Sequence, residues 1–165
     1  MKTLVVYYSL TGNNEKAARI VADSLSAELE AVETVKKFAV KEGKPTFGTI
    51  FTGGMGSFLG RLPKIKPAGF DPAQFDLVVL CAPLWAGNLA PPMRAYVAEN
   101  RRGFRGKVAF LCISGSGNGF DKAVKLIEEA AGKKLAGALS ITDKEMEGGA
   151  YAEKAKMFAA GLKLK

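Results

Sequence analysis

The side chains best suited to chemistry lie first in SLTGNN, residues 9–14, a polar loop between an apolar run and a helical pattern. Backbone N–H groups lack partners at the start of a helix, and the helix dipole there favours an anion. Gly12 allows close backbone approach, and four side chains can add donors: Ser9, Thr11, Asn13 and Asn14. The GxxxxGK(S/T) pattern of a P-loop is absent, so neutral hydrogen bonds would hold a phosphate here. An ordinary strand–helix turn with Asn14 as its N-cap is the alternative interpretation.

Two later loops are equally polar and contain glycine: PLWAGNLAPP at residues 83–92 and SGSGNG at residues 114–119. The single tryptophan, Trp85, directly follows an apolar run, and an exposed indole there could stack on a planar ring. Gly87 and Asn88 could bind the edge of a heterocycle. Packing of Trp85 on the edge of its own sheet is the alternative interpretation.

In the last of these loops, Ser114 and Ser116 stand among glycines and offer another row of accessible N–H groups. A plain flexible turn is the alternative interpretation. Together the three loops predict a site with a phosphate end and a flat aromatic end.

The chain has no histidine, which excludes every mechanism built on a Ser–His or Cys–His pair. Its two cysteines, Cys81 and Cys112, lie in apolar runs and are predicted to be buried, reduced thiols. A structural zinc site is not expected from two cysteines without histidine. We therefore predict no catalytic residue and no metal ligand.

The formal net charge of +8 favours acidic partners or surfaces. Its basic clusters are not interleaved with exposed aromatic residues, so nucleic-acid binding is not expected. No apolar run approaches the roughly 20 residues that span a bilayer. Met1 precedes a strand pattern without the features of a signal peptide, so we expect a cytoplasmic location.

Continuous apolar runs, typical of buried strands, alternate along the chain with segments whose apolar residues have helical spacing. This pattern predicts one α/β domain, residues 1–165. The continuous apolar runs predict strands at residues 3–8, 31–35, 76–82, 107–113 and 138–142. The three- and four-residue spacings predict helices at residues 15–29, 49–59, 91–100, 121–131 and 150–162. Two prolines suit the start of the third helix, and Asp121 is expected to cap the fourth.

Strands that alternate with helices predict a parallel sheet covered on both faces. Right-handed crossovers restrict this sheet to a doubly wound arrangement. Ligands bind such sheets beyond the carboxyl ends of the strands. All three polar loops follow predicted strands, so we expect them to meet at that edge.

The three loops are similar, in order and in spacing, to those of the flavodoxins. YSLTGNN resembles the flavodoxin phosphate loop, (S/T)xTGxT, through Ser9, Thr11 and Gly12. APLWAGNLAPPMRAYV resembles the loop after the third strand of flavodoxin-like proteins, and CISGSG resembles their later SGGSG segment. The resemblance spans nearly the whole chain. It implies a flavodoxin-like doubly wound three-layer sandwich, with a five-stranded parallel sheet in the order 2-1-3-4-5.

FMN is the cofactor that this resemblance implies, with its phosphate on residues 9–14 and its isoalloxazine between the other two loops. The implied cofactor-binding residues are Ser9, Leu10, Thr11, Gly12, Asn13, Asn14, Pro83, Leu84, Trp85, Ala86, Gly87, Asn88, Ser114, Gly115, Ser116 and Gly117. Three features depart from the family. Asn14 replaces the usual final Thr, Ala86 stands where a second Trp is often found, and the chain is basic where electron-carrying flavodoxins are typically acidic.

The resemblance implies an FMN-binding electron-transfer protein that meets a redox partner protein or a small electron acceptor. An FMN-dependent NAD(P)H oxidoreductase acting on a quinone or similar acceptor is the alternative, because the acidic face of a carrier is missing. Nothing in the sequence resembles a nicotinamide site, so the carrier is the preferred interpretation and enzymatic activity stays open. A flavin-free interaction module on the same fold is a third interpretation. A phospho-receiver is disfavoured because residues 1–14 contain no Asp or Glu.

Overall fold

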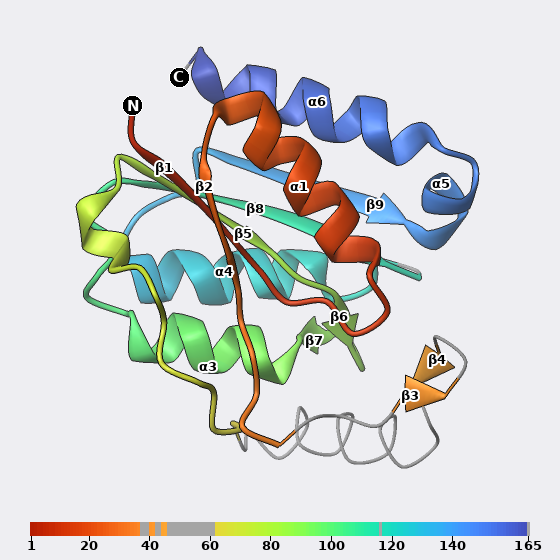
Figure 1. The fold of residues 1–165 in the computed structure, drawn as a ribbon, viewed down its shortest axis with the longest axis horizontal. Helices are drawn as coiled ribbons and strands as arrows, with labels where there is room; N and C mark the ends of the chain where they lie inside the picture. Colours follow the sequence, from red (N-terminus) through yellow and green to blue (C-terminus); the bar gives the residue numbers. More distant parts are fainter. Residues whose placement is uncertain (37–39, 42–43, 46–61, 116, 165) are drawn as a thin grey trace.

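A five-stranded parallel sheet forms the centre of the protein, as predicted (Figure 1). The computed structural model describes residues 1–36, 40–41, 44–45, 62–115 and 117–164. The sheet strands are β1 (Thr3–Tyr7), β2 (Glu28–Ala31), β5 (Leu77–Cys81), β8 (Lys107–Ser114) and β9 (Gly137–Thr142). Their order, β2-β1-β5-β8-β9, is the predicted 2-1-3-4-5 topology.

Helices cover both faces of this sheet, which confirms the three-layer sandwich (Figure 1). One face carries α1 (Asn13–Leu25) and α6 (Ala150–Lys163), and their small residues pack on the sheet around Val5, Val79 and Leu111. The other face carries α3 (Pro91–Glu99) and α4 (Phe120–Ala131), which pack around Phe110 and Leu80. The central strands lie between two apolar layers, which explains their continuous apolar sequences.

The first helix ends earlier than its apolar pattern predicts. Helix α1 stops at Leu25 because Ser26 adopts a left-handed conformation, φ 50°, and its N–H bonds back to carbonyls of the last turn. Leu29 therefore lies in β2, paired with Val5, and not on the helical stripe. The second strand accordingly covers Glu28–Ala31 and not residues 31–35. The spacing of Leu25 and Leu29 fits a longer helix, but Leu29 pairs with Val5 in the sheet instead.

The predicted cap of α4, Asp121, is wrong, and Asn14 does not cap α1, as the alternative interpretation of the first loop had it. Helices α1 and α4 both begin after a left-handed glycine, Gly12 at φ 92° and Gly119 at φ 88°, without a side-chain cap. Asn14 and Asp121 instead lie inside the first turn of these helices. The predicted helix at residues 49–59 lies outside the described residues.

Several short elements were not predicted from the sequence. Strands β6 (Leu84–Trp85) and β7 (Asn88–Leu89) form a two-residue hairpin whose central residues, Ala86 and Gly87, both have positive φ. Such angles match the twist of a tight hairpin. The other short elements are β3 (Val40–Lys41), β4 (Lys44–Pro45), a 3-10 helix (Pro72–Gln74) and α5 (Asp143–Glu147).

Candidate cofactor site at the carboxyl edge of the sheet

The three polar loops follow β1, β5 and β8, which are neighbours in the sheet. Because these strands are parallel, their carboxyl ends meet at one edge, near the start of α1 and the β6–β7 hairpin (Figure 1). Tyr8 N–H donates to Cys81 O at 2.9 Å, and Ala82 N–H donates to Leu111 O at 3.1 Å, so the three loop entrances are hydrogen-bonded together. The fold thus brings the predicted site segments to one place.

The first loop presents backbone donors at the start of α1. Gly12 N–H donates to Ser9 Oγ at 3.0 Å, which folds the loop into a tight turn. The first backbone N–H of the helix that donates to the preceding turn is that of Lys16, which donates to Gly12 O. Within the described part of the chain, the N–H groups of Asn13, Asn14 and Glu15 have no acceptor. These are the donors that an anion at a helix start would use.

The side-chain amide of Asn14 stabilises the fold. Its Nδ2 donates to Ile113 O at 3.1 Å, and its Oδ1 accepts from Ile113 N–H at 3.0 Å, across 99 residues of sequence. Cys81 Sγ donates to Asn14 O at 3.2 Å, and Asn14 is only 4% exposed. Its side chain therefore ties the first loop to β8, and its backbone N–H is the group that remains for a ligand.

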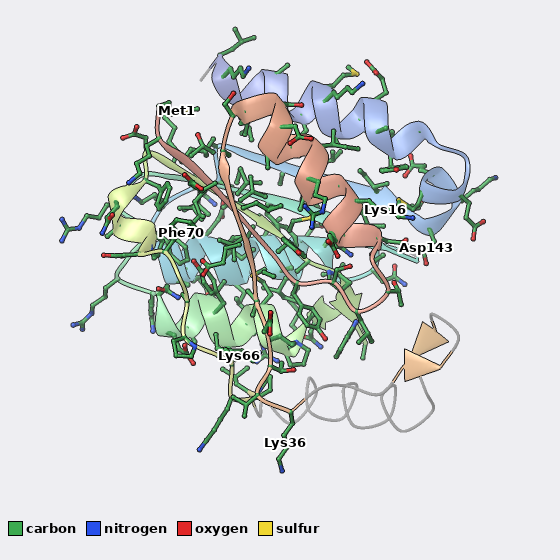
Figure 2. The ribbon with its side chains drawn as sticks, viewed as in Figure 1. Met1, Lys16, Lys36, Lys66, Phe70 and Asp143 are labelled. Atoms are coloured by element: carbon green, nitrogen blue, oxygen red, sulfur yellow. The ribbon has the colours of Figure 1, made fainter. Side chains whose placement is uncertain are left out.

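An ion pair neutralises the one carboxylate in the first turn of α1. Arg19 Nη2 lies 2.7 Å from Glu15 Oε1, and Arg19 Nε donates to the same oxygen at 3.1 Å. Burial, and then the Glu15 charge, raise the pKa of Tyr7, which precedes the loop. Lys16 is exposed at the same end of the helix (Figure 2). The helix start therefore carries no net negative charge that would oppose an anion.

Trp85 is partly buried in strand β6 and packs edge-on against Tyr8, with ring centroids 5.8 Å apart and an interplanar angle of 74°. Tyr8 is buried, and its burial raises its pKa. Trp85 thus packs on its own sheet edge, the alternative interpretation of its position. Stacking of the remaining indole surface on a flavin stays a prediction.

The hairpin is held by its own polar groups. Asn88 Nδ2 donates to Ala86 O at 3.1 Å, and Ala90 N–H donates to Pro83 O at 3.1 Å. Leu84 pairs with Leu89 across the turn.

Leu10, a predicted cofactor-binding residue of the first loop, is half-buried.

The third loop contacts the hairpin directly. A Cβ at Gly119 would lie 2.1 Å from Gly87 O, so a glycine is required where the two loops touch. Ser114 is 8% exposed and its Oγ lies 3.5 Å from Cys112 Sγ, whereas Gly115 is exposed and Gly117 has φ 68°. Ser116 lies outside the described residues.

Sequence reasoning missed one charged residue at this edge. A Cβ at Gly115 would lie 3.5 Å from Asp143 Oδ2, so the first residue of α5 reaches the third loop. Asp143 points outward at the same edge as Lys16 in Figure 2. The available signal was TDKE at residues 142–145, a capping-box sequence that marks the start of a helix.

Both cysteines are buried thiols, as predicted. Burial raises the pKa of Cys81 well above its ordinary value. Burial also raises the pKa of Cys112 to about 11, although its contact with Ser114 lowers it in part. Neither sulfur is therefore a thiolate near neutral pH.

Within the described residues, no three His, Cys, Asp or Glu side chains are grouped as metal ligands. No helix in that part of the chain has the length and apolar character needed to cross a membrane.

No protein-family model matches the chain, and no curated protein sequence matches it significantly. Among solved structures, it is similar to a flavoprotein of Lactobacillus acidophilus NCFM in complex with FMN. That comparison has a TM-score of 0.70 and 24% identity, and covers 89% of this chain and 97% of that one.

The apo form of the Lactobacillus acidophilus NCFM flavoprotein gives a TM-score of 0.62 at 24% identity, and covers 88% of this chain and 95% of that one. Oxidised flavodoxin 2 of Bacillus cereus gives a TM-score of 0.59 at 19% identity, and covers 98% of this chain and 97% of that one. These likenesses extend over nearly the full length of each chain and agree with the strand order of the sheet. The chain therefore has the flavodoxin-like fold.

Proposed function

We propose that this protein binds FMN at the carboxyl edge of its sheet and uses it in electron transfer. The observation that carries the proposal is the row of unused N–H groups at Asn13, Asn14 and Glu15, directly after the Ser9–Gly12 turn. A phosphate dianion is the ligand that such a helix start favours most. The solved relatives include a flavoprotein bound to FMN, which supports the choice of this anion.

The phosphate end fits this ligand. A Cβ at Gly12 would meet no atom within 4 Å, so the loop is open on that side. Thr11 is exposed and its hydroxyl has no partner among the described residues. We expect the Ser9 and Thr11 hydroxyls and the helix N–H groups to hold the phosphate, with the Asn14 amide holding the loop against β8.

The ring end would lie at the hairpin and the third loop. Gly87 and Asn88 of the hairpin, and Gly115 with Gly117 of the third loop, offer backbone groups for hydrogen bonds to a ring edge. When bound, FMN supplies the redox chemistry by accepting and releasing one or two electrons. The protein contributes binding, orientation and the surrounding charge, and no acid–base side chain is required of it.

We propose an electron carrier as the function, with a redox partner protein or a small acceptor. The second candidate is an oxidoreductase that passes electrons from NAD(P)H to a quinone or similar small molecule. The net charge of +8 favours this candidate, because electron carriers of this fold are typically acidic. A basic carrier would instead need an acidic partner, which the same charge would attract.

Absorption spectroscopy tests the flavin proposal directly. We expect the purified protein to be yellow, or its apoprotein to shift and sharpen the FMN absorption bands on titration. A folded protein that leaves the FMN spectrum unchanged would favour the flavin-free module instead.

Stopped-flow mixing separates the two redox functions. The loaded protein is mixed with NADH or NADPH, and the reduced protein is then mixed with a benzoquinone. Rapid reduction by a nicotinamide followed by rapid oxidation by the quinone would assign the oxidoreductase. A carrier would show slow reduction by nicotinamides alone and fast reduction once a flavodoxin reductase is added.

A further inference from the structure

A basic hollow lies at the amino edge of the sheet, where the parallel strands begin. It is open to solvent, has a volume of about 530 Å³, and lies between the starts of β5 and β8 and the loop that follows α4. The β6–β7 hairpin of the candidate cofactor site lies at the other end of the sheet (Figure 1). Strand β8 has eight residues, so roughly 25 Å of strand separates the two edges. The hollow is therefore distinct from the cofactor site.

The backbone around the hollow is held by close packing. A Cβ at Gly106 would overlap Asp76 O, so the loop before β8 lies directly on the residue before β5. Lys107 N–H donates to the same carbonyl at 2.7 Å, and Ala136 N–H donates to Val108 O at 2.7 Å. The side chains of the hollow are thus attached to segments whose positions the sheet fixes.

The hollow carries an excess of positive charge. Four cationic side chains line it: Arg105, Lys107, Lys133 and Lys134. Two carboxylates lie beside them. Asp76 Oδ2 accepts from Lys2 N–H at 2.7 Å, and Glu128 Oε2 lies 2.8 Å from Lys134 Nζ. Four cations against two carboxylates favour an anionic ligand, and the volume falls within the roughly 300–1,000 Å³ of small-molecule sites.

Arg105 and Lys133 are the cations best placed to bind that ligand. Lys133 is half-buried, and its Nζ donates to Arg105 O at 2.8 Å and to Gly106 O at 3.0 Å. These bonds position the ammonium and leave its third N–H for a ligand. Neither Lys133 nor the exposed guanidinium of Arg105 has a carboxylate partner in the described part of the chain. A guanidinium binds phosphate oxygens through two parallel N–H bonds, and an ammonium adds a point charge.

We propose that this hollow binds a compact oligophosphate, a chain of phosphoryl groups that is either free or attached to a nucleoside. Arg105 and Lys133 donate to the phosphate oxygens, and the other two cations balance the charge of the neighbouring groups. Because all four cations line one hollow, a compact polyanion meets them together. An extended acidic peptide would place most of its carboxylates beyond them. The site uses no residue of the candidate cofactor site and does not depend on flavin binding.

Inorganic tripolyphosphate and inorganic phosphate make a pair of probes that differ in the number of linked phosphoryl groups. Each is titrated into the full-length protein at fixed ionic strength while the backbone amides of Gly106, Lys107 and Lys133 are followed by NMR. We expect saturable shifts with tripolyphosphate and binding at least about tenfold weaker with phosphate, as for loss of a charged hydrogen bond. The amides of Thr11 and Gly12 report separately on any binding at the candidate phosphate loop.

Adenosine triphosphate identifies the source of the phosphate chain. Binding tighter than that of tripolyphosphate at the same amides would assign a nucleotide, and equal or weaker binding would assign the free chain.

Four variants complete the experiment. Arg105→Gln and Lys133→Gln should each weaken tripolyphosphate binding by about tenfold or more. Arg105→Lys keeps the charge but loses the planar fork, so it should weaken binding by a smaller factor. Lys156→Gln, an exposed change on α6, alters the net charge equally and should leave binding unchanged.

Absence of saturable shifts at the amides of the hollow, equal binding of tripolyphosphate and phosphate, or equal losses in Arg105→Gln and Lys156→Gln would each overturn the proposal. A hexaglutamate peptide that binds there more tightly than tripolyphosphate would overturn it in favour of an acidic protein partner. Circular dichroism establishes that each variant is folded. Should Lys133→Gln fail to fold, Arg105→Gln decides alone, because its exposed side chain has no described partner to lose.

Discussion

At the scale of single residues, Asn14 belongs to the candidate phosphate loop by sequence but to the core by its side chain. Both backbone polar groups of Ile113 bond to its amide, at 3.1 and 3.0 Å. Asn13, its neighbour, is half-buried and has no such bond among the described residues. Two adjacent asparagines in the same turn thus have different roles.

This difference predicts unequal effects of truncation on stability. Asn14→Ala leaves a buried N–H and a buried C=O of Ile113 unpaired and should lower the free energy of unfolding by about 2–4 kcal/mol. Asn13→Ala should change it by about 0.5 kcal/mol or less, as substitutions that remove no buried contact or hydrogen bond usually do. Urea denaturation of both variants, without FMN, makes the comparison. Equal losses would show that the Asn14 amide does not tie the loop to β8.

At the scale of elements, the hairpin and the third loop are positioned by contact between two glycines. A Cβ at Gly119 would overlap the Gly87 carbonyl, at 2.1 Å from its oxygen. Gly119 directly precedes α4, whose Phe120 ring stacks on Phe110 of the sheet with ring centroids 5.6 Å apart. Helix α4 therefore fixes how closely the two loops that would flank a flavin ring approach each other.

Two glycines at the ends of α4 make a matched pair of test sites. Gly119 and Gly132 both have positive φ, but a Cβ at Gly132 would meet no atom within 4 Å. Gly132→Ala should cost about 1 kcal/mol from backbone strain alone. Gly119→Ala should cost a further 1–3 kcal/mol or so from overlap with Gly87. Thermal unfolding of both variants measures the difference, and equal costs would contradict the close contact between the loops.

The capping box of α5 predicts a dependence of stability on pH. The Lys154 ammonium, then the Thr142 N–H and hydroxyl, lower the pKa of Glu145 from 4.5 to about 2. A carboxyl with a lowered pKa in the folded state stabilises it above the pKa of the unfolded state. That contribution should disappear as the pH falls from 4.5 towards 2.

Glu145→Gln tests this assignment because glutamine can still complete the capping box. The variant should lose less stability than the wild type between pH 4.5 and pH 2, by chemical denaturation at each pH. Glu147→Gln, an exposed change in the same helix, is the control and should follow the wild type. Parallel curves for the wild type and Glu145→Gln would refute the role of Glu145.

The elements themselves show what sequence could and could not predict. Strands β1, β5 and β8 were predicted within one or two residues because strands buried on both faces need continuous apolar runs. The end of α1 was missed because Leu29 fits both a helical stripe and the pairing with Val5. The role of the Asn14 amide was not predictable, since its partner, Ile113, is 99 residues away.

At the scale of the whole molecule, the net charge of +8 is the feature that most separates this chain from acidic electron carriers. A positive protein field favours the addition of negative charge anywhere inside it, and dissolved salt screens that field. The effect is general and does not require a particular lysine beside the flavin.

If FMN binds as proposed, this field should raise the potential at which the flavin takes up its second electron. The potential should be highest at low ionic strength and should fall as salt is added, since the screening length shrinks from about 30 Å at 0.01 M to about 10 Å at 0.1 M. Spectroelectrochemistry over that range provides the measurement. A potential that is constant or rises with salt would contradict the argument from charge.

The central claim is that residues 9–14 bind phosphate through neutral donors at the start of α1. Thr11 is the residue best placed for a test because it is exposed and its hydroxyl has no partner among the described residues, so its replacement should leave the fold intact. Thr11→Glu adds a carboxylate to the loop, and Thr11→Gln adds nearly the same volume without charge. FMN and riboflavin differ only in the phosphate that this loop would bind.

Isothermal titration measures the affinity of the wild type and both variants for each ligand and tests the claim most directly. Circular dichroism establishes that each variant is folded. We predict that Thr11→Glu weakens FMN binding severely and riboflavin binding far less. Thr11→Gln should weaken FMN binding less than Thr11→Glu, by no more than the roughly 1.5–3 kcal/mol of one hydrogen bond to a charged group. Equal losses for FMN and riboflavin in a folded Thr11→Glu variant would show that this loop does not recognise phosphate.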